Sequence, residues 1–435
     1  MGHITGPDRV YHQLQQKLDR NVTGAPESPV LIKILKLLFS PEDAQFAKQI
    51  PIQPTRLDVL SKKLGMAPDE LGDKMTEMAQ RGLMIDFEHK GQRYFALPPV
   101  VIGFFELTFM RTRDNLPMAE LSRLFDEYMA ENDRFARAVF QGQTQIGRSL
   151  IHEEALPEEA HTEILDWERA SYIVQSASTA GVSLCSCRHK ASHLGKACDR
   201  SQQNCLSLNY AAEALIQNGL ARPITTGEAM RTLEECKEDG LAQTGDNVQH
   251  KVTYLCNCCG CCCGMIQAIK MFDIRNAIVS SNWIMEINLS KCKGCGTCVE
   301  VCPVNAIDIS CEEEGDQKRK QAVLEKTLCL GCGVCYSACR LGAISMKSRE
   351  QEILVPETIF DRIVSMAVER DKLADILFKE PEKLSYRALG RIIGVLEKSS
   401  PFKAAMSIKP LKSVFLNTLV KGAKKNAGEI GEVAV

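Results

Sequence analysis

The spacing of apolar positions divides the chain into segments of different character. A polar lead-in at residues 1–29 precedes a region, residues 30–106, in which apolar residues recur at helical spacing in successive short segments. The region ends in two segments of alternating polarity that meet at a turn at Lys90 and Gly91. Helical spacing places apolar side chains on one face of a helix, and alternation places them on one face of a strand. The pattern therefore predicts three helices closed by a β-hairpin.

This order of elements resembles a winged helix-turn-helix. The charge of residues 30–106 does not favour DNA, because ten basic residues are balanced by ten acidic ones. The helix that would enter the major groove is itself rich in acids, namely Asp69, Glu70, Asp73 and Glu77. We therefore expect a structural or protein-docking role for this region, with DNA binding as the alternative.

Two further regions have mainly helical periodicity. Residues 107–180 predict a helical connector, in which Glu163, Asp166 and Glu168 are expected to lie on a solvated face.

The tail, residues 351–435, carries ten basic residues against one acid between Lys383 and Lys425. Basic amphipathic helices can lie on an anionic membrane surface or dock on an acidic partner. A helical cap packed on the body of the protein is the alternative for this tail.

Eight of the 20 cysteines form two copies of one motif, C-x2-C-x2-C-x3-C, at a constant offset. Three cysteines at this spacing can wrap one iron–sulfur cluster, while the fourth lies farther along the chain and reaches the partner cluster. The spacing predicts two [4Fe-4S] clusters. A zinc site and a disulfide framework are the alternatives.

The flanks of the motif repeat as well, since residues 287–309 and 324–346 each read as strand, ligand loop, helical turn and strand. Residues 285–350 resemble bacterial-type 2[4Fe-4S] ferredoxins. The resemblance implies one cluster held by Cys292, Cys295, Cys298 and Cys339 and another held by Cys329, Cys332, Cys335 and Cys302.

Particular residues around these motifs carry further expectations. Pro303 follows the first motif, whereas Arg340 follows the second. A cation there would favour the reduced cluster and raise its potential, so we expect two unequal clusters. Four glycines are expected to let the backbone approach the inorganic sulfides: Gly294, Gly296, Gly331 and Gly333.

Residues 181–284 contain a second concentration of cysteines, in two compact runs. Four thiolates can hold one cubane, so the number allows one or two additional iron–sulfur clusters. Zinc is the competing cofactor, because thiolate quartets also suit it, and a set of buried, inert thiols is a further alternative. The candidate ligands are Cys185, Cys187, Cys198, Cys205, Cys256, Cys258, Cys259, Cys261, Cys262 and Cys263.

The run CSCRHK, the block LCNCCGCCCG and the following ferredoxin repeat are together similar to winged-helix-containing 4Fe-4S ferredoxin-like proteins of anaerobic bacteria. This resemblance implies a redox role without naming a substrate. Cys258, Cys259 and Gly260 are also similar to the CCG motif of heterodisulfide reductases, in which paired cysteines hold a noncubane cluster.

The sequence also indicates where the protein is located. No window reaches the roughly 18 uninterrupted apolar residues of a membrane span. We therefore expect a cytoplasmic location, where thiols stay reduced. The basic tail is expected to be the part that could contact the inner membrane face. The sequence has no Rossmann glycine pattern or phosphate loop, so hydride transfer from a nicotinamide is not expected.

We expect an α+β multidomain protein that transfers single electrons between a protein donor and a protein acceptor, as a partner of an oxidoreductase and without catalytic residues of its own. The alternatives are a regulator whose winged helix is gated by cluster state and a catalytic subunit similar to heterodisulfide reductase. The expected domains are 1–29, 30–106, 107–180, 181–284, 285–350 and 351–435.

Overall fold

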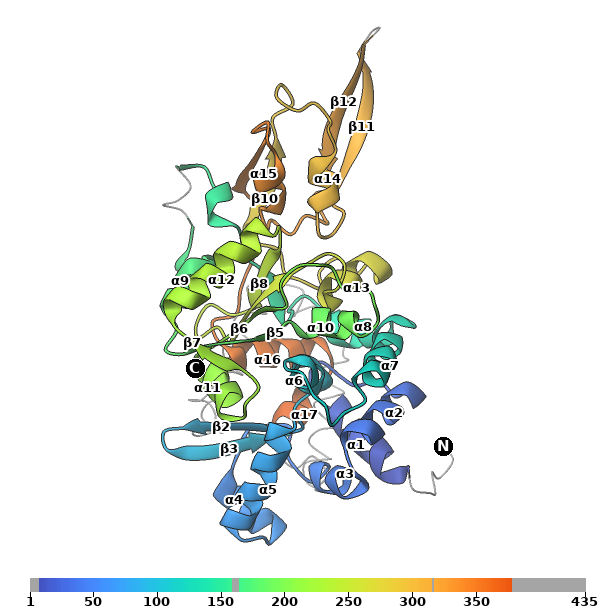
Figure 1. Cartoon of the computed structure of the whole chain (residues 1–435), viewed down its shortest axis with the longest axis vertical. Coiled ribbons are helices and arrows are strands. Elements are labelled where there is room, and N and C mark those ends of the chain that lie inside the picture. The colour runs from blue at the N-terminus through green and yellow to red at the C-terminus, as the bar shows by residue number, and fades with distance from the viewer. Residues whose placement is uncertain (1–7, 159–163, 315–316, 378–435) are drawn as a thin grey trace, which may run out of the picture. The chain divides into compact units, whose positions relative to one another are not determined.

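The computed structural model describes residues 8–158, 164–314 and 317–377, which form a mixed structure of helices and sheets (Figure 1). Contacts divide the chain into two compact units. Among the described residues, the first comprises 8–144, the short segment Ala214–Leu220 and 356–377, and the second comprises Gln145–Glu213 and Ala221–Val355. The cysteines that form the candidate sites all belong to the second unit.

The first unit begins with helices and a small sheet. Ser40 and Asp43 form a capping box that starts one of the helices, and Gly65 ends another in the left-handed conformation. The hairpin expected at Lys90 and Gly91 is present, and both residues have positive φ. The assignment as a winged helix stays a prediction. The elements are α1 (Arg9–Asp19), α2 (Pro29–Leu38), α3 (Pro41–Ala47), β1 (Thr55–Arg56), α4 (Leu57–Leu64), α5 (Pro68–Gln80), β2 (Ile85–His89) and β3 (Gln92–Ala96), with the sheet order β1-β3-β2.

The rest of the first unit is helical. Its core contains a cluster of aromatic rings from Phe104, Phe105, Phe109 and Phe125. The helices are α6 (Phe105–Phe109), α7 (Met118–Ala130), α8 (Arg134–Phe140), α16 (Ile359–Glu369) and α17 (Leu373–Leu377). An irregular segment, η1 (Val100–Phe104), precedes α6 and has extended backbone at Val101 and Ile102.

The second unit contains a six-stranded antiparallel sheet with the order β4-β8-β9-β6-β5-β7. Its strands are β4 (Gly147–Ser149), β5 (Ala180–Leu184), β6 (Gln203–Leu208), β7 (Arg222–Ile224), β8 (Ala242–Asp246) and β9 (Tyr254–Cys258). The helices along this part of the chain are α9 (Ala170–Gln175), α10 (Ser186–Ser192), α12 (Thr226–Glu238) and α13 (Gly264–Phe272), with 3-10 turns η2 (Glu153–Ala155) and η4 (Asp166–Glu168). Helix α11 (Asn209–Gln217) begins in this unit and ends in the Ala214–Leu220 segment of the first unit.

Two details within residues 107–180 differ from expectation. The segment is not helical throughout, because β4 joins the sheet beside β8. Glu168, expected on a solvated face, is buried. Its carboxylate accepts hydrogen bonds from Asn282 Nδ2 at 2.9 Å and from the Leu165 N–H at 3.1 Å. These bonds replace the water that the carboxylate loses on burial.

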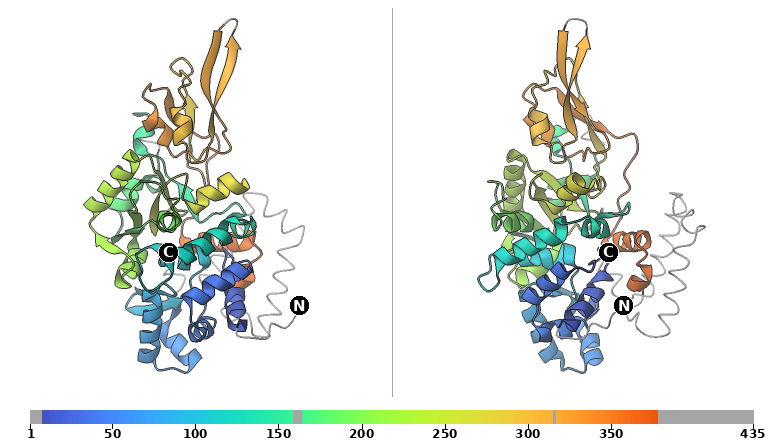
Figure 2. Two further views of the ribbon diagram at one scale, coloured as in Figure 1. Left: turned by 45° about the vertical axis from the view of Figure 1, so that its right-hand side comes forward. Right: turned by 90° about the vertical axis from the view of Figure 1, so that its right-hand side faces the viewer.

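The ferredoxin-like part of the second unit has the internal repeat that the sequence predicts (Figure 2). The first strand of one copy pairs with the last strand of the other, β10 (Trp283–Ile287) with β13 (Ile344–Ser348). The two inner strands, β11 (Ile307–Glu314) and β12 (Gln317–Leu324), pair with each other. A short helix follows each ligand loop, α14 (Thr297–Val301) and α15 (Val334–Ala338).

The predictions for the basic tail between Lys383 and Lys425 lie outside the described residues, as does the one for Glu163. Within the part of the chain that the structure describes, no helix is both long enough and apolar enough to cross a membrane.

Candidate metal centres

The first ferredoxin set consists of Cys292, Cys295, Cys298 and Cys339, which line one cavity. Backbone N–H groups point at two of its sulfurs. Ala322 donates to Cys292 Sγ at 3.5 Å, and Ala343 donates to Cys339 Sγ at 3.4 Å. Cys295 is exposed, so this set reaches the surface of its unit.

The second ferredoxin set consists of Cys302, Cys329, Cys332 and Cys335, which line a separate cavity. Ala306 N–H donates to Cys302 Sγ at 3.2 Å. The other three cysteines of this set are buried. Burial raises the pKa of the Cys332 thiol to about 12, whereas hydrogen bonds from Thr297 lower the pKa of Cys295 in the first set. The second set is therefore the drier of the two.

Both sets suit a cubane by their donor chemistry. Each places four sulfurs around a cavity, and backbone amides donate to sulfur in both, as expected where thiolates carry negative charge. The structure thus brings together the two groups of four that the resemblance implied.

The second set has a nearby cation that the sequence did not identify. Arg340 is exposed and directly follows Cys339, which belongs to the first set. Arg349, which follows β13, donates from Nη2 to the carbonyl of Cys329 at 2.7 Å and from Nε to the carbonyl of Ser281 at 2.8 Å. Burial lowers the pKa of Arg349, and the nearby Cys329 opposes this shift. Sequence reasoning missed Arg349 because it lies outside the cysteine motif.

The glycines of the ligand loops all have positive φ, so their conformation favours glycine. The close approach at Gly331 is to neighbouring protein groups, since a Cβ there would meet the carbonyl oxygen of Trp283 and Ser281 Oγ. A Cβ at Gly294 would likewise meet the backbone of Lys320. At these two positions the glycine is required by the packing of the ligand loop on β10 and β12.

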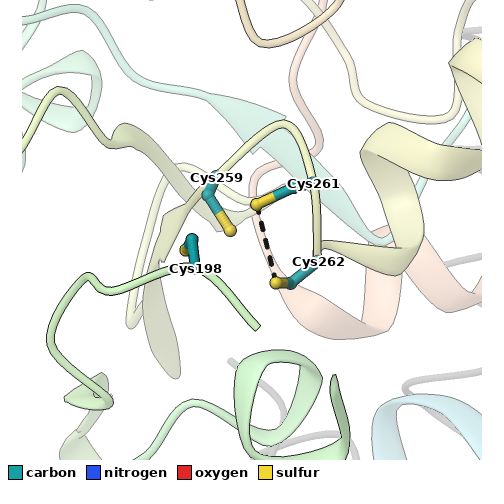
Figure 3. Close-up of side chains that lie close together, drawn as sticks. All are labelled: Cys198, Cys259, Cys261 and Cys262. Atoms are coloured by element: carbon teal, nitrogen blue, oxygen red, sulfur yellow. Dashed lines mark hydrogen bonds between the residues drawn. The ribbon is translucent and has the colours of Figure 1, made fainter. Parts of the chain in front are cut away.

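The ten cysteines of residues 181–284 separate into two groups. We call the first the compact set: Cys198, Cys259, Cys261 and Cys262, whose four sulfur atoms all lie within 4.8 Å of one another (Figure 3). The thiols of Cys261 and Cys262 are 3.6 Å apart. Cys198 comes from the loop between α10 and β6, and the other three come from the loop between β9 and α13.

Arg188 of α10 lies against the compact set. Its side chain is fully buried and hydrogen-bonds to the thiol groups of Cys198 and Cys259. A hydrogen bond from Cys262 and a weaker contribution from Arg188 lower the pKa of Cys259 to about 3, although burial alone would raise it. The guanidinium also donates to the carbonyl of Ser201 at 2.5 Å. A buried cation here offsets the negative charge that thiolate ligands would bring.

We call the second group the thiol ring, because each thiol is close to two others. Cys256 hydrogen-bonds to Cys205 and Cys258. Cys263 hydrogen-bonds to Cys258 and to Cys187. Cys185 completes the ring, since it lies close enough to Cys187 and Cys205 for their charges to add to the effect of burial in raising its pKa. The members are Cys185, Cys187, Cys205, Cys256, Cys258 and Cys263.

The sheet explains how distant cysteines meet in this ring. Cys205 on β6 and Cys256 on β9 lie beside each other, because Leu206 pairs with Leu255 in antiparallel register. Cys258 lies two residues after Cys256 and therefore on the same face. Thr244 on β8 contacts the Cys258 sulfur from its Oγ1 at 3.2 Å. Hydrogen bonds from Cys256 and Cys263 lower the pKa of Cys258 to about 6.

Two contacts join the cysteine-rich region to the second ferredoxin set. Ala242, which pairs with Cys258 across β8 and β9, belongs to one buried cluster with Cys332 and Val334. Gly260, between two cysteines of the compact set, lies so close to Pro303 that a Cβ on Gly260 would be 2.7 Å from the carbonyl oxygen of Pro303. Pro303 directly follows Cys302, so both contacts lead to the drier ferredoxin set.

Comparison with known proteins supports the chemistry of the ferredoxin-like part. Residues 285–308, which include the first cysteine motif, match the family model of the 4Fe-4S binding domain. No curated protein and no solved structure matches the chain. With the matched domain and the grouped cysteines, the chain is an iron–sulfur protein that binds at least one [4Fe-4S] cluster.

Proposed function

We propose that this protein transfers single electrons between protein partners through two [4Fe-4S] clusters, one in each ferredoxin set. The observation that carries the proposal is the pair of cavities, each lined by four cysteines from both copies of one repeat. When bound, a [4Fe-4S] cluster accepts and releases one electron at a time. The chain supplies the thiolates, the amide donors and the burial that set each potential.

The two sets have different surroundings, which suggests different roles. Cys295 is exposed, so the first set offers the site at which a redox partner gains close access. The second set is buried and is joined through Ala242 and Pro303 to the cysteine-rich region. In our proposal the thiol ring holds a third iron–sulfur centre, and the packed contact from Cys258 through Ala242 to Cys332 keeps it near the second set.

The first unit fits a role in docking a protein partner. Its α5 helix presents four exposed acids, which would repel a nucleic-acid backbone. A partner with a basic surface would suit this face. A redox-gated DNA-binding regulator is therefore the less supported function.

A catalytic role similar to heterodisulfide reductase is favoured only by the lowered pKa values of the Cys258 and Cys259 thiols.

The test uses the full chain purified without oxygen. The protein is reduced with dithionite and then mixed with a one-electron acceptor, with the iron–sulfur absorbance followed over time. We expect rapid reoxidation in the wild type, and a lower electron capacity by about one in both Cys295→Ser and Cys332→Ser. An unchanged electron capacity in both variants would contradict the proposal, as would a colourless wild-type protein.

A further inference from the structure

The compact set differs in its geometry from the other groups of cysteines. Its four sulfurs all lie within 4.8 Å of one another. Within the described residues, the sulfurs of neither ferredoxin set lie this close together, although each set lines a cavity. The cysteines of the compact set are therefore more closely spaced than those of either ferredoxin set.

The spacing fits a single ion. Four thiolates bound to one tetrahedral zinc ion at about 2.3 Å would have sulfur–sulfur distances of about 3.8 Å. In a cubane each thiolate binds a different iron, and the four sulfurs are spread around a larger body. The 3.6 Å separation of Cys261 and Cys262 agrees with the first arrangement.

The surroundings of the compact set suit a structural ion rather than a catalytic one. All four ligands come from the protein, and Cys259 and Cys262 are buried within a cluster that includes Ala191, Cys236 and Leu241. Four thiolates around a divalent ion leave two negative charges, and the buried Arg188 beside Cys198 and Cys259 offsets one of them. A closed tetrathiolate site is typical of structural zinc.

From this geometry we propose that Cys198, Cys259, Cys261 and Cys262 hold one zinc ion, which joins the loop after α10 to the loop before α13. The ion would fix Gly260, which lies between two of the ligands. The carbonyl of Gly260 already accepts hydrogen bonds from Gln267 Nε2 at 2.8 Å and Lys270 Nζ at 3.1 Å. Zinc would thereby hold the loop that contacts Pro303. Because zinc carries no redox chemistry, this inference does not rest on the proposed electron transfer.

The first test measures metal content in the full chain purified without oxygen. We expect about one zinc in the wild type in addition to the iron. Cys261→Ser removes a ligand at an exposed position, and we expect it to lose zinc to a chelator at least tenfold faster while retaining its iron. The control is Cys311→Ser, an exposed cysteine on β11 outside every group, which should release zinc as the wild type does.

The second test does not depend on the folding of a variant. Zinc K-edge X-ray absorption of the wild type should show four sulfur neighbours at about 2.3 Å. A zinc-free wild type would overturn the proposal, as would nitrogen or oxygen donors at zinc. Loss of iron instead of zinc in Cys261→Ser would also overturn it.

Discussion

The first ferredoxin set and the compact set each contain four cysteines, yet they are built differently. In the ferredoxin set the sulfurs surround a cavity, and backbone amides of Ala322 and Ala343 point at them. In the compact set the sulfurs all lie within 4.8 Å of one another, and the cation of Arg188 lies beside them. The number of cysteines is thus compatible with either cofactor, and the distances between sulfurs distinguish a cluster from a single ion.

The largest expected effect is loss of a whole cluster. Cys332→Ser removes a proposed ligand of the second ferredoxin set, and we expect the protein to lose about four irons. It should also lose stability, because Cys332 packs with Ala242 and Val334. Iron quantification and thermal unfolding without oxygen measure both effects. Cys311→Ser is the control, and full iron content in Cys332→Ser would remove this cysteine from the ligands.

Gly331→Ala tests the packing of the ligand loop on β10. Gly331 has a φ of +70°, and its Cβ would collide with Trp283 and Ser281. We expect the free energy of unfolding to fall by about 1–3 kcal/mol or more. Gly342→Ala is the matched control, because Gly342 also has positive φ, at +58°, but has open space around it. Equal destabilisation of the two variants would show that strain alone, and not the contact, decides the effect.

Gly260→Ala tests the contact between the compact set and the ferredoxin-like part. The added methyl would overlap Pro303, and overpacking of this kind lowers stability by about 1–3 kcal/mol. Thermal unfolding of the holoprotein provides the measurement. Gly264→Ala in α13 is the control, because its Cβ meets no neighbour and alanine favours the helix. An unchanged melting temperature for Gly260→Ala would mean that the two regions are not in tight contact.

The smallest effect is expected from Arg349→Gln. Loss of this cation near Cys329 should lower the potential of the second cluster by tens of millivolts, where about 59 mV corresponds to a tenfold change in a one-electron equilibrium. Redox titration followed by EPR measures the shift. Arg340→Gln is the comparison. Arg340 is exposed and follows Cys339 of the first set, so its loss should leave the potential of the second cluster nearly unchanged. An equal or larger shift of the second potential in Arg340→Gln would contradict the role of Arg349.

Local sequence patterns were sufficient for much of the fold. The hairpin at Lys90 and Gly91 and the strand–loop–helix–strand repeat follow from short-range periodicity, and the structure contains both. Strand β4 was missed because its three residues are too short for a period to be visible. The burial of Glu168 was missed because its partner, Asn282, is distant in sequence.

The cysteine-rich region was predicted only in part. Its two runs of cysteines allowed one or two further clusters without indicating which cysteines share a site, and the structure mixes the runs. The compact set takes Cys198 from the first run, and the thiol ring takes Cys205 from the same run. This partition depends on β6 lying beside β9 in the sheet, and such long-range pairing leaves no local signal.

The most direct test of the central claim is a potentiometric titration of the anaerobic full chain, with EPR spins quantified at each potential and fitted to one-electron steps. We predict two steps at unequal potentials that involve the ferredoxin sets, and the two corresponding spins should disappear one at a time in Cys295→Ser and Cys332→Ser. A wild-type protein with no reducible spins, or one in which neither substitution removes a spin, would contradict the account.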